Sequence, residues 1–139
     1  YDSENNNRIE VKFSRVVKKH KQKIKETNVV DQCMSNAYLE NRLITRDNID
    51  IFKFDSNIQQ IKRHKFDYLF YGLFFLDGIE IYGIESTKID TIPGYSNKQH
   101  DGNIGEGQFH LNNNSIDFHR KNYIQMELNY DKLFELLQK

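Results

Sequence analysis

A short segment near the start of the chain carries side chains that could hold a metal ion and a phosphate group. One residue separates Glu10 from Lys12, and Asp2 lies shortly before them. Two carboxylates can share a hard cation such as Mg²⁺, which prefers oxygen ligands. A neighbouring lysine can bind a phosphate and orient the water that attacks it. These residue types therefore suit Mg²⁺-dependent cleavage of phosphodiester bonds.

The residues around Glu10 and Lys12 alternate between apolar and polar types, which predicts a β-strand over residues 8–16. Successive side chains of a strand point to opposite faces. The apolar set is expected to enter a core: Ile9, Val11 and Phe13. The polar set is expected on the opposite face: Glu10, Lys12 and Ser14. Because an acidic residue two positions before a lysine is common by chance, a solvated ion pair on an exposed strand is the alternative interpretation.

The charge of the chain is balanced overall but unevenly distributed. Its 139 residues fit one domain with its own core, and the formal net charge is zero. Residues 1–30 nevertheless hold eight Lys or Arg and four acidic residues, whereas residues 76–110 hold two Lys and six acidic residues. A neutral total can therefore hide a basic face that follows a phosphate backbone. The basic run over 17–27 is either such a phosphate-tracking loop or an ordinary solvated surface.

The chain has a single cysteine, Cys33, so no disulfide can form within it. This favours a reducing, intracellular setting. Its apolar runs are too short to cross a membrane. Because the chain begins with Tyr1 and not with Met, we expect one domain over 1–139 that is the C-terminal part of a longer protein.

The middle of the chain is predicted to hold a helix followed by strands. A helix is expected over 29–43 with Cys33 packed inside it, then a strand over 49–54 and a strand edge or loop over 57–63. The clearest strands cover 66–75 and 79–84, with a hairpin-turn signal, Asp-Gly, between them. We expect this hairpin to be the centre of the core and its aromatic stripe to be buried: Phe66, Tyr68, Phe70 and Phe74.

The C-terminal part is predicted to begin with a polar, glycine-containing loop over 95–107. Backbone amides beside glycine can approach a phosphate or a base edge closely, although a flexible surface loop is the alternative. Short elements are expected after the loop: strand 108–111, helix 116–122, strand 123–128 and helix 130–138, with Asn129 as the N-cap of the last helix. The spacing of His100, His110 and His119 fits no structural zinc pattern.

The order Asp2, seven intervening residues and Glu10-Val11-Lys12 resembles the motif of the PD-(D/E)XK nuclease superfamily, and within it the type II restriction endonucleases. Segments 59–62, 66–70 and 99–110 are similar to patterns in the C-terminal halves of restriction enzymes. The resemblance implies an α/β (α+β) fold in which helices flank a mixed central β-sheet. The first helix and strand of that fold would lie before residue 1.

The resemblance also implies an activity: Mg²⁺-dependent hydrolysis of double-stranded DNA at a specific sequence, by a homodimer in a prokaryotic restriction–modification system. Asp2, or Glu4 in its place, would hold Mg²⁺ together with Glu10 and the Val11 carbonyl, and Lys12 would contact the scissile phosphate and the attacking water. Gln60 and Lys62 would reach the phosphate, and Gln99, Asn103 and Gln108 would read bases, since amides pair well with adenine. The full set of expected DNA contacts is Ser14, Arg15, Lys18, Lys19, Gln60, Lys62, Gln99, His100, Asn103, Gln108 and His110.

Three alternatives stay open at the level of sequence. A repair nuclease of the same superfamily would use the same residues. A non-catalytic DNA-binding module would keep the fold and bind DNA without cutting it. A structural or partner-binding domain would carry these acids as ordinary surface, and it would show no salt-sensitive affinity for DNA.

Overall fold

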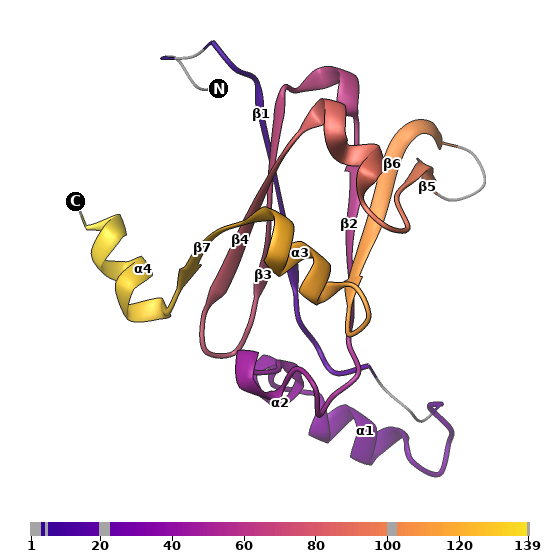
Figure 1. Cartoon of the computed structure of the whole chain (residues 1–139). Helices are drawn as coiled ribbons and strands as arrows, with labels where there is room; N and C mark the ends of the chain where they lie inside the picture. Colours follow the sequence, from indigo (N-terminus) through magenta and orange to yellow (C-terminus); the bar gives the residue numbers. More distant parts are fainter. Residues whose placement is uncertain (1–3, 5, 20–22, 100–102, 139) are drawn as a thin grey trace.

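Two β-sheets lie against each other in the computed structural model, which describes residues 4, 6–19, 23–99 and 103–138, with only the backbone at Asn103 (Figure 1). The first sheet has four strands in the order β1 (Ile9–Arg15), β3 (Tyr68–Phe74), β4 (Ile79–Glu85) and β7 (Ile124–Leu128). β1 runs parallel to β3, whereas the other neighbours are antiparallel. The predicted strands 8–16, 66–75, 79–84 and 123–128 are therefore confirmed, and so is the Asp-Gly hairpin.

The second sheet has three antiparallel strands in the order β2 (Asp55–Ile61), β6 (Asn103–Asn112) and β5 (Ser96–Gln99). The predicted loop over 95–107 is thus wrong, because most of it belongs to the β5 and β6 strands. Glycine has a structural reason here: a Cβ on Gly107 would lie 2.3 Å from the Tyr95 hydroxyl oxygen. Because Gly107 has no side chain, the Tyr95 ring can lie close to its backbone. This glycine therefore does not indicate a flexible loop.

The strand predicted over 49–54 is also wrong, since this segment forms turns before β2. A side chain from far along the chain explains the difference. The side-chain nitrogen of Asn113 donates to the carbonyl oxygens of Ile49 at 2.7 Å and Phe52 at 2.9 Å. Its side-chain oxygen accepts from the backbone amide of Phe54 at 3.1 Å. These are the backbone groups that a neighbouring strand would otherwise have paired.

The helices are short and lie around the sheets: α1 (Val29–Ser35), α2 (Leu39–Arg42), α3 (Ile116–Tyr123) and α4 (Tyr130–Leu137), with 3₁₀ turns η1 (Arg46–Asn48), η2 (Arg63–Lys65) and η3 (Ser86–Thr91). The single helix predicted over 29–43 is split into α1 and α2. Asn36 ends α1, and its side-chain amide donates to the Gln32 carbonyl at 2.7 Å, which competes with helix continuation. Cys33 is exposed and does not pack as predicted.

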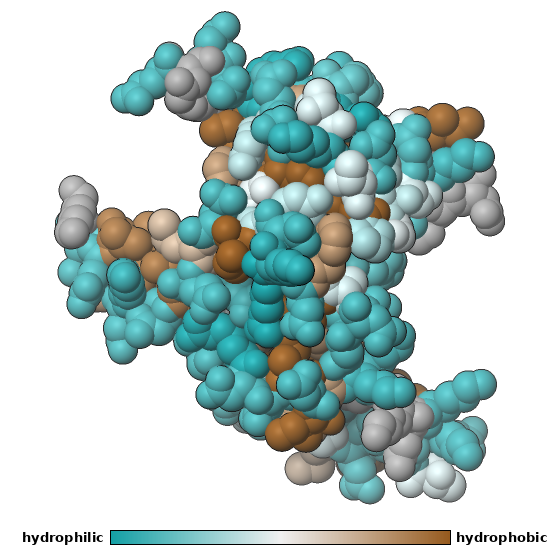
Figure 2. All heavy atoms as spheres, viewed as in Figure 1, coloured by the Kyte–Doolittle hydropathy of each residue, from teal (hydrophilic) through white to brown (hydrophobic). Residues whose placement is uncertain are grey.

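The C-terminal helix α4 forms as predicted, and the Asn129 side chain accepts a hydrogen bond from the Lys132 amide at 2.8 Å. α4 projects beyond β7, and Figure 2 shows apolar side chains along it on the surface. None of its residues is buried. Within the described ranges, no helix combines the length and the apolar character needed to cross a membrane.

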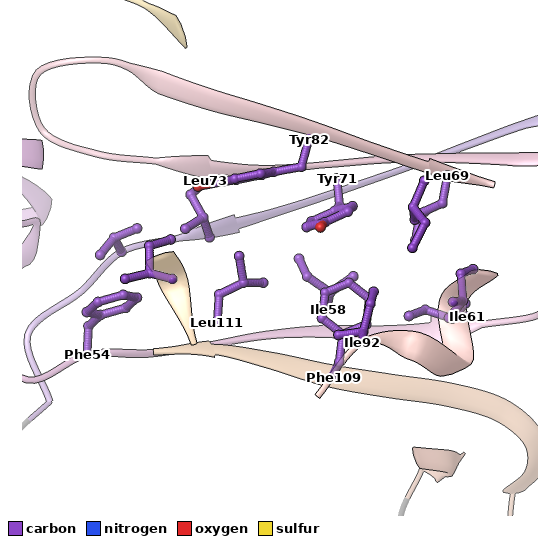
Figure 3. Close-up of a cluster of buried hydrophobic side chains, with 14 of the residues drawn as sticks. Phe54, Ile58, Ile61, Leu69, Tyr71, Leu73, Tyr82, Ile92, Phe109 and Leu111 are labelled. Atoms are coloured by element: carbon purple, nitrogen blue, oxygen red, sulfur yellow. The ribbon is translucent and has the colours of Figure 1, made fainter. Parts of the chain in front are cut away.

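The core lies between the two sheets, as Figure 3 shows. The four-stranded sheet contributes Leu69, Tyr71 and Leu73 from β3 and Tyr82 from β4, all fully buried. The three-stranded sheet faces them with Ile58, Ile61, Phe109 and Leu111. The predicted fold class, α+β, is confirmed by this arrangement. The single central sheet expected from the sequence is replaced by two sheets that enclose the core between them.

The expected aromatic stripe is only partly buried. Phe66 is buried, but Tyr68, Phe70 and Phe74 are half-buried on the outer face of the four-stranded sheet. Strand alternation explains this correction, because the inner face of β3 is taken by the intervening residues, Tyr71 among them.

Candidate functional site

Strand β1 places Glu10 and Lys12 on the inner side of the four-stranded sheet, at its edge. In the pairing with β3, Glu10 lies opposite Leu69 and Lys12 lies opposite Tyr71. Ser14 continues the same row opposite Leu73. These polar residues therefore share a face with the buried core residues of β3. β1 has a partner on one side only, since the sheet order begins with it.

The alternation predicted for β1 is confirmed, but the predicted sides are reversed. Val11 and Phe13, expected in the core, are 56% and 42% exposed. They lie on the outer face, where the Phe13 ring is 5.1 Å from the Phe74 ring and covers Gly72. The physical reason is that a lysine can lay its long stem along apolar surface and keep its ammonium group at the edge.

Glu10 and Lys12 form a close ion pair in which both side chains still reach solvent. The Lys12 Nζ lies 2.7 Å from the Glu10 Oε1, and the two side chains are 26% and 36% exposed. Within the described part of the chain, neither side chain has another ion-pair or hydrogen-bond partner. An ammonium group has three donors, and a carboxylate can accept several hydrogen bonds. Both groups therefore keep capacity for a ligand.

The chemistry of this pair fits a magnesium ion that is shared with substrate. Mg²⁺ is usually held by one or two carboxylates together with water and substrate phosphates, and not by a cage of protein ligands. Glu10 supplies one accessible carboxylate. No group of three or more His, Cys, Asp or Glu side chains that could hold a metal occurs among the described residues. The second expected ligand, Asp2, lies outside the described residues, and Glu4 is exposed.

Two of the residues expected to contact DNA, Ser14 and Arg15, lie at the end of β1. They line a pocket of about 590 Å³ together with Asp55 and Arg42. β1 and β2 meet at this end, because the Ser56 hydroxyl donates to the Arg15 carbonyl at 3.0 Å (Figure 1). The strand that carries Glu10 and Lys12 thus leads directly into this pocket.

Lys18 and Lys19 line a second pocket, of about 700 Å³. Lys18 donates from Nζ to the Asn41 carbonyl at 3.1 Å and lies 4.6 Å from the centre of the Phe52 ring. Lys19 Nζ is 3.5 Å from Asp55 Oδ2. Both lysines therefore have contacts within the chain, and both remain beside open space.

Three further expected DNA contacts lie on the three-stranded sheet and are hydrogen-bonded or ion-paired to side chains of another of its strands. Gln99 is buried and donates to the Gln59 side chain at 2.9 Å. Gln108 accepts from the Asn57 side chain at 3.1 Å. His110 Nδ1 lies 2.8 Å from the Asp55 carboxylate. Each of these three side chains is thus held by one side-chain partner on β2.

The remaining expected contacts are more scattered. Gln60 is exposed at a bulge of β2, where its φ of 59° is in the left-handed region. Lys62 Nζ lies 2.9 Å from Glu106 Oε1. Asn103 begins β6 with only its backbone described, and His100 lies outside the described residues.

Sequence reasoning missed Asp55, Asn57 and Gln59, which face the same side of β2. The sequence does carry a signal, since polar residues occupy positions 55, 57 and 59 and the side chain of Ile58 points to the opposite face. The strand expected over 49–54 conflicts with this signal. Arg42 was also missed, and no pattern around it in the sequence indicates its place in the pocket beside Arg15.

A second ionic cluster, also unpredicted, is buried between α3 and the four-stranded sheet. Arg120 Nη2 lies 2.6 Å from Glu80 Oε1, and the Tyr82 hydroxyl donates to the same carboxylate. Burial, followed by the Glu80 charge, raises the pKa of Tyr82 far above its usual range. Burial is the largest single influence on the pKa of Arg120 and lowers it, but the hydrogen bond to Glu80, the Glu80 charge and Tyr82 together raise it by more, so the net direction is upward.

His119 lies beside this cluster and is fully buried, with Nδ1 2.8 Å from the Tyr71 hydroxyl. Its Nε2 has no hydrogen-bond partner among the described residues. Burial lowers the pKa of His119 to about 4, so the ring is neutral at physiological pH. A neutral, enclosed imidazole among aromatic rings fits a structural role.

Comparisons of the chain with protein-family models, with curated proteins and with solved structures each found no match. The geometry of the described residues therefore carries the functional argument, and the nuclease resemblance rests on the motif of the sequence.

Proposed function

We propose that this chain is the catalytic part of a Mg²⁺-dependent endonuclease that cuts double-stranded DNA at a specific sequence, as type II restriction enzymes of the prokaryotic cytoplasm do. The observation that carries the proposal is the pair of Glu10 and Lys12. It combines a short distance with solvent access on both side chains. The proposed partner is duplex DNA, and a homodimer would match the two-fold symmetry of many recognition sites.

In the proposed reaction, water attacks the phosphorus in line with the leaving oxygen. Lys12 would donate hydrogen bonds to a non-bridging phosphate oxygen and to the attacking water, and so fix their relative position. Glu10 would hold the metal, together with Asp2 and the Val11 carbonyl. Bound Mg²⁺ supplies charge neutralisation at the phosphate and a more acidic water. The edge position of β1 leaves one side of the strand open for a substrate as large as DNA.

The test is cleavage of unmethylated plasmid DNA by the full-length protein in Mg²⁺, compared with Glu10→Ala and Lys12→Ala. We expect discrete fragments from the parent and a loss of roughly 10²–10³ in rate for each variant, the size seen when one charge-stabilising group is removed. Glu85 and Lys88 form a surface ion pair at 3.0 Å and provide matched controls. Glu85→Ala and Lys88→Ala should cut like the parent. Equal cutting by Glu10→Ala would contradict the proposal.

Metal binding gives a readout that does not depend on cleavage. Mg²⁺ should raise the Tm of the parent by mass action and leave that of Glu10→Ala almost unchanged.

A non-catalytic DNA-binding module is the second candidate. It is favoured by one observation: a single carboxylate, Glu10, accompanies Lys12 among the residues described at this site. DNA binding by the folded full-length protein, with no cutting in Mg²⁺, would support this module and overturn the enzyme.

A further inference from the structure

The six arginines of the chain, all of them in its described part, fall into two groups. Four have a carboxylate partner: Arg8 with Asp67, Arg46 with Asp77, Arg63 with Asp90 and Arg120 with Glu80. The other two, Arg15 and Arg42, have no ion pair with a described residue. An arginine is always charged, and its planar fork of donors matches a carboxylate or a phosphate.

Arg15 and Arg42 line the same pocket, although they are far apart in the sequence. Arg15 ends β1 and Arg42 ends α2, and both border the pocket of about 590 Å³. Asp55 is the acidic residue of the lining, but its two oxygens are already engaged. Oδ1 lies 2.8 Å from His110 Nδ1, and Oδ2 lies 3.5 Å from Lys19 Nζ. The pocket therefore keeps positive charge that no carboxylate of its lining balances.

Arg42 supplies an independent indication that an acceptor is missing. Its Nε is buried and has no hydrogen-bond partner in the part of the chain that the structure describes. A buried donor without a partner is unfavourable, so such groups are normally satisfied by the protein, by water or by a ligand. An anion with two oxygens could accept from the guanidinium in a bidentate manner.

The other walls of the pocket indicate which anion fits. Phe13, Leu39 and Phe74 border it beside the two arginines. A phosphate in a nucleic acid carries sugars on both sides, and a deoxyribose can lie against apolar side chains. Inorganic phosphate has no group that would use these walls. The lining thus suits a sugar–phosphate unit better than a free ion.

The edge position of β1 brings this pocket and the candidate active site to the same border of the sheet. Arg15 follows Lys12 by three positions, so the two side chains leave opposite faces of β1. Both can be reached from the open side of this strand, where a duplex is large enough to contact both. From this we infer that Arg15 and Arg42 bind a backbone phosphate of the DNA whose scissile phosphate Lys12 contacts. This inference rests on the proposed function, since DNA is the ligand in both.

The first experiment measures binding of a fluorescein-labelled duplex by anisotropy, without divalent metal and over a range of salt concentrations. We expect Arg15→Ala and Arg42→Ala each to weaken binding about tenfold. Each should also lower the slope of log K against log salt by about one, as expected when one phosphate contact is lost. Arg42→Lys should retain the slope but not the full affinity, because lysine keeps the charge and loses the fork.

Arg63→Ala is the matched control, because Arg63 already has Asp90 as its partner. It should bind DNA like the parent. The Tm of each variant must match that of the parent within the scatter of the measurement. If Arg42→Ala is not folded, Arg42→Lys and Arg15→Ala carry the test. DNA affinity that is the same in all three pocket variants would overturn the inference, as would a folded parent that binds no duplex.

A second experiment adds inorganic phosphate to the protein and follows the Tm. If phosphate stabilises the parent but not Arg42→Ala, while DNA affinity is unchanged by the substitution, the pocket takes a free anion and the DNA contact is overturned. If Arg42→Ala weakens DNA binding, the contact is supported whatever phosphate does. Because these measurements need no cleavage, a parent that never cuts DNA could still bind it through Arg15 and Arg42. The two proposals can therefore fail separately.

Discussion

Two ion pairs of nearly equal length lie on the four-stranded sheet, and they differ in burial and in the number of donors. Lys12 Nζ is 2.7 Å from Glu10 Oε1, and Arg120 Nη2 is 2.6 Å from Glu80 Oε1. The Glu80 side chain is 2% exposed, and it accepts from two nitrogens of Arg120 and from the Tyr82 hydroxyl. The Glu10 side chain is 36% exposed and has one donor.

The difference separates a carboxylate that completes the core from one that can take a ligand. Both acids precede their strand partner by two residues, Glu10 with Lys12 and Glu80 with Tyr82, so spacing alone does not distinguish them. Donors already occupy Glu80, and leaving it unpaired in the interior would be costly. Glu10 keeps free acceptor positions at the edge of the sheet. Its function is therefore testable without loss of the fold, which cannot be said of Glu80.

The largest expected effect is on stability, from removal of the buried carboxylate. Glu80→Ala should lower the free energy of unfolding by about 3 kcal/mol, because it leaves the Arg120 charge and the Tyr82 hydroxyl without their acceptor. This value is at the lower end of the usual cost of removing one partner of a buried ion pair, because the Arg120 side chain is 29% exposed. Urea denaturation measures the change.

A double-mutant cycle tests whether the loss comes from the pair. Arg120→Ala should be destabilising alone, and the double variant Glu80→Ala/Arg120→Ala should lose less than the sum of the two single changes. Additive losses would mean that the two groups do not depend on each other, and that the buried cluster is not a unit.

The second expected effect is a pH dependence centred on His119, beside the buried cluster. Its pKa falls from 6.5 to about 4 in the folded protein because burial disfavours the charged ring. The unfolded chain therefore binds the proton first, and stability is fully present above pH 6.5 and is lost as pH falls from 6.5 to about 4. The shift corresponds to roughly 3 kcal/mol.

Urea denaturation of the parent and of His119→Gln, at neutral pH and near pH 4, measures this dependence. The stability difference between parent and variant should shrink as the pH falls, because the variant has no imidazole to protonate. His64→Gln is the control, since the His64 side chain is exposed. A difference that stays constant with pH would show that His119 is not the group responsible.

The sequence predicted the strand around Glu10 correctly but not the side to which it points. Alternation is a local property of residues 8–16. Which face of β1 points toward the core depends on the residues that pack against each face. The face with Lys12 lies beside Tyr71 and the core, whereas Phe13 packs over Gly72 on the outer face. Apolar residues on a half-exposed outer face gave the same pattern as apolar residues in a core.

Other errors have a cause that lies far along the chain. Asn113 bonds the backbone at Ile49, 64 positions away, and prevents a strand that the local alternation predicted. The Tyr95 ring requires glycine at 107, so this glycine belongs to a strand and not to the predicted loop. The pocket of Arg15 and Arg42 depends on such long-range contacts too. By contrast, the hairpin of β3 and β4 and the cap of α4 were predicted because their signals are local.

The smallest expected effect concerns the stability of the candidate site itself. Glu10→Ala should change the free energy of unfolding by less than about 1 kcal/mol, because an ion pair that reaches solvent contributes little. The same urea titration that is used for Glu80→Ala measures it. A loss near 3 kcal/mol would place Glu10 with Glu80 as a structural carboxylate, and any loss of cleavage by the variant would then be explained by unfolding. A small change together with lost cleavage would instead separate function from fold at this residue.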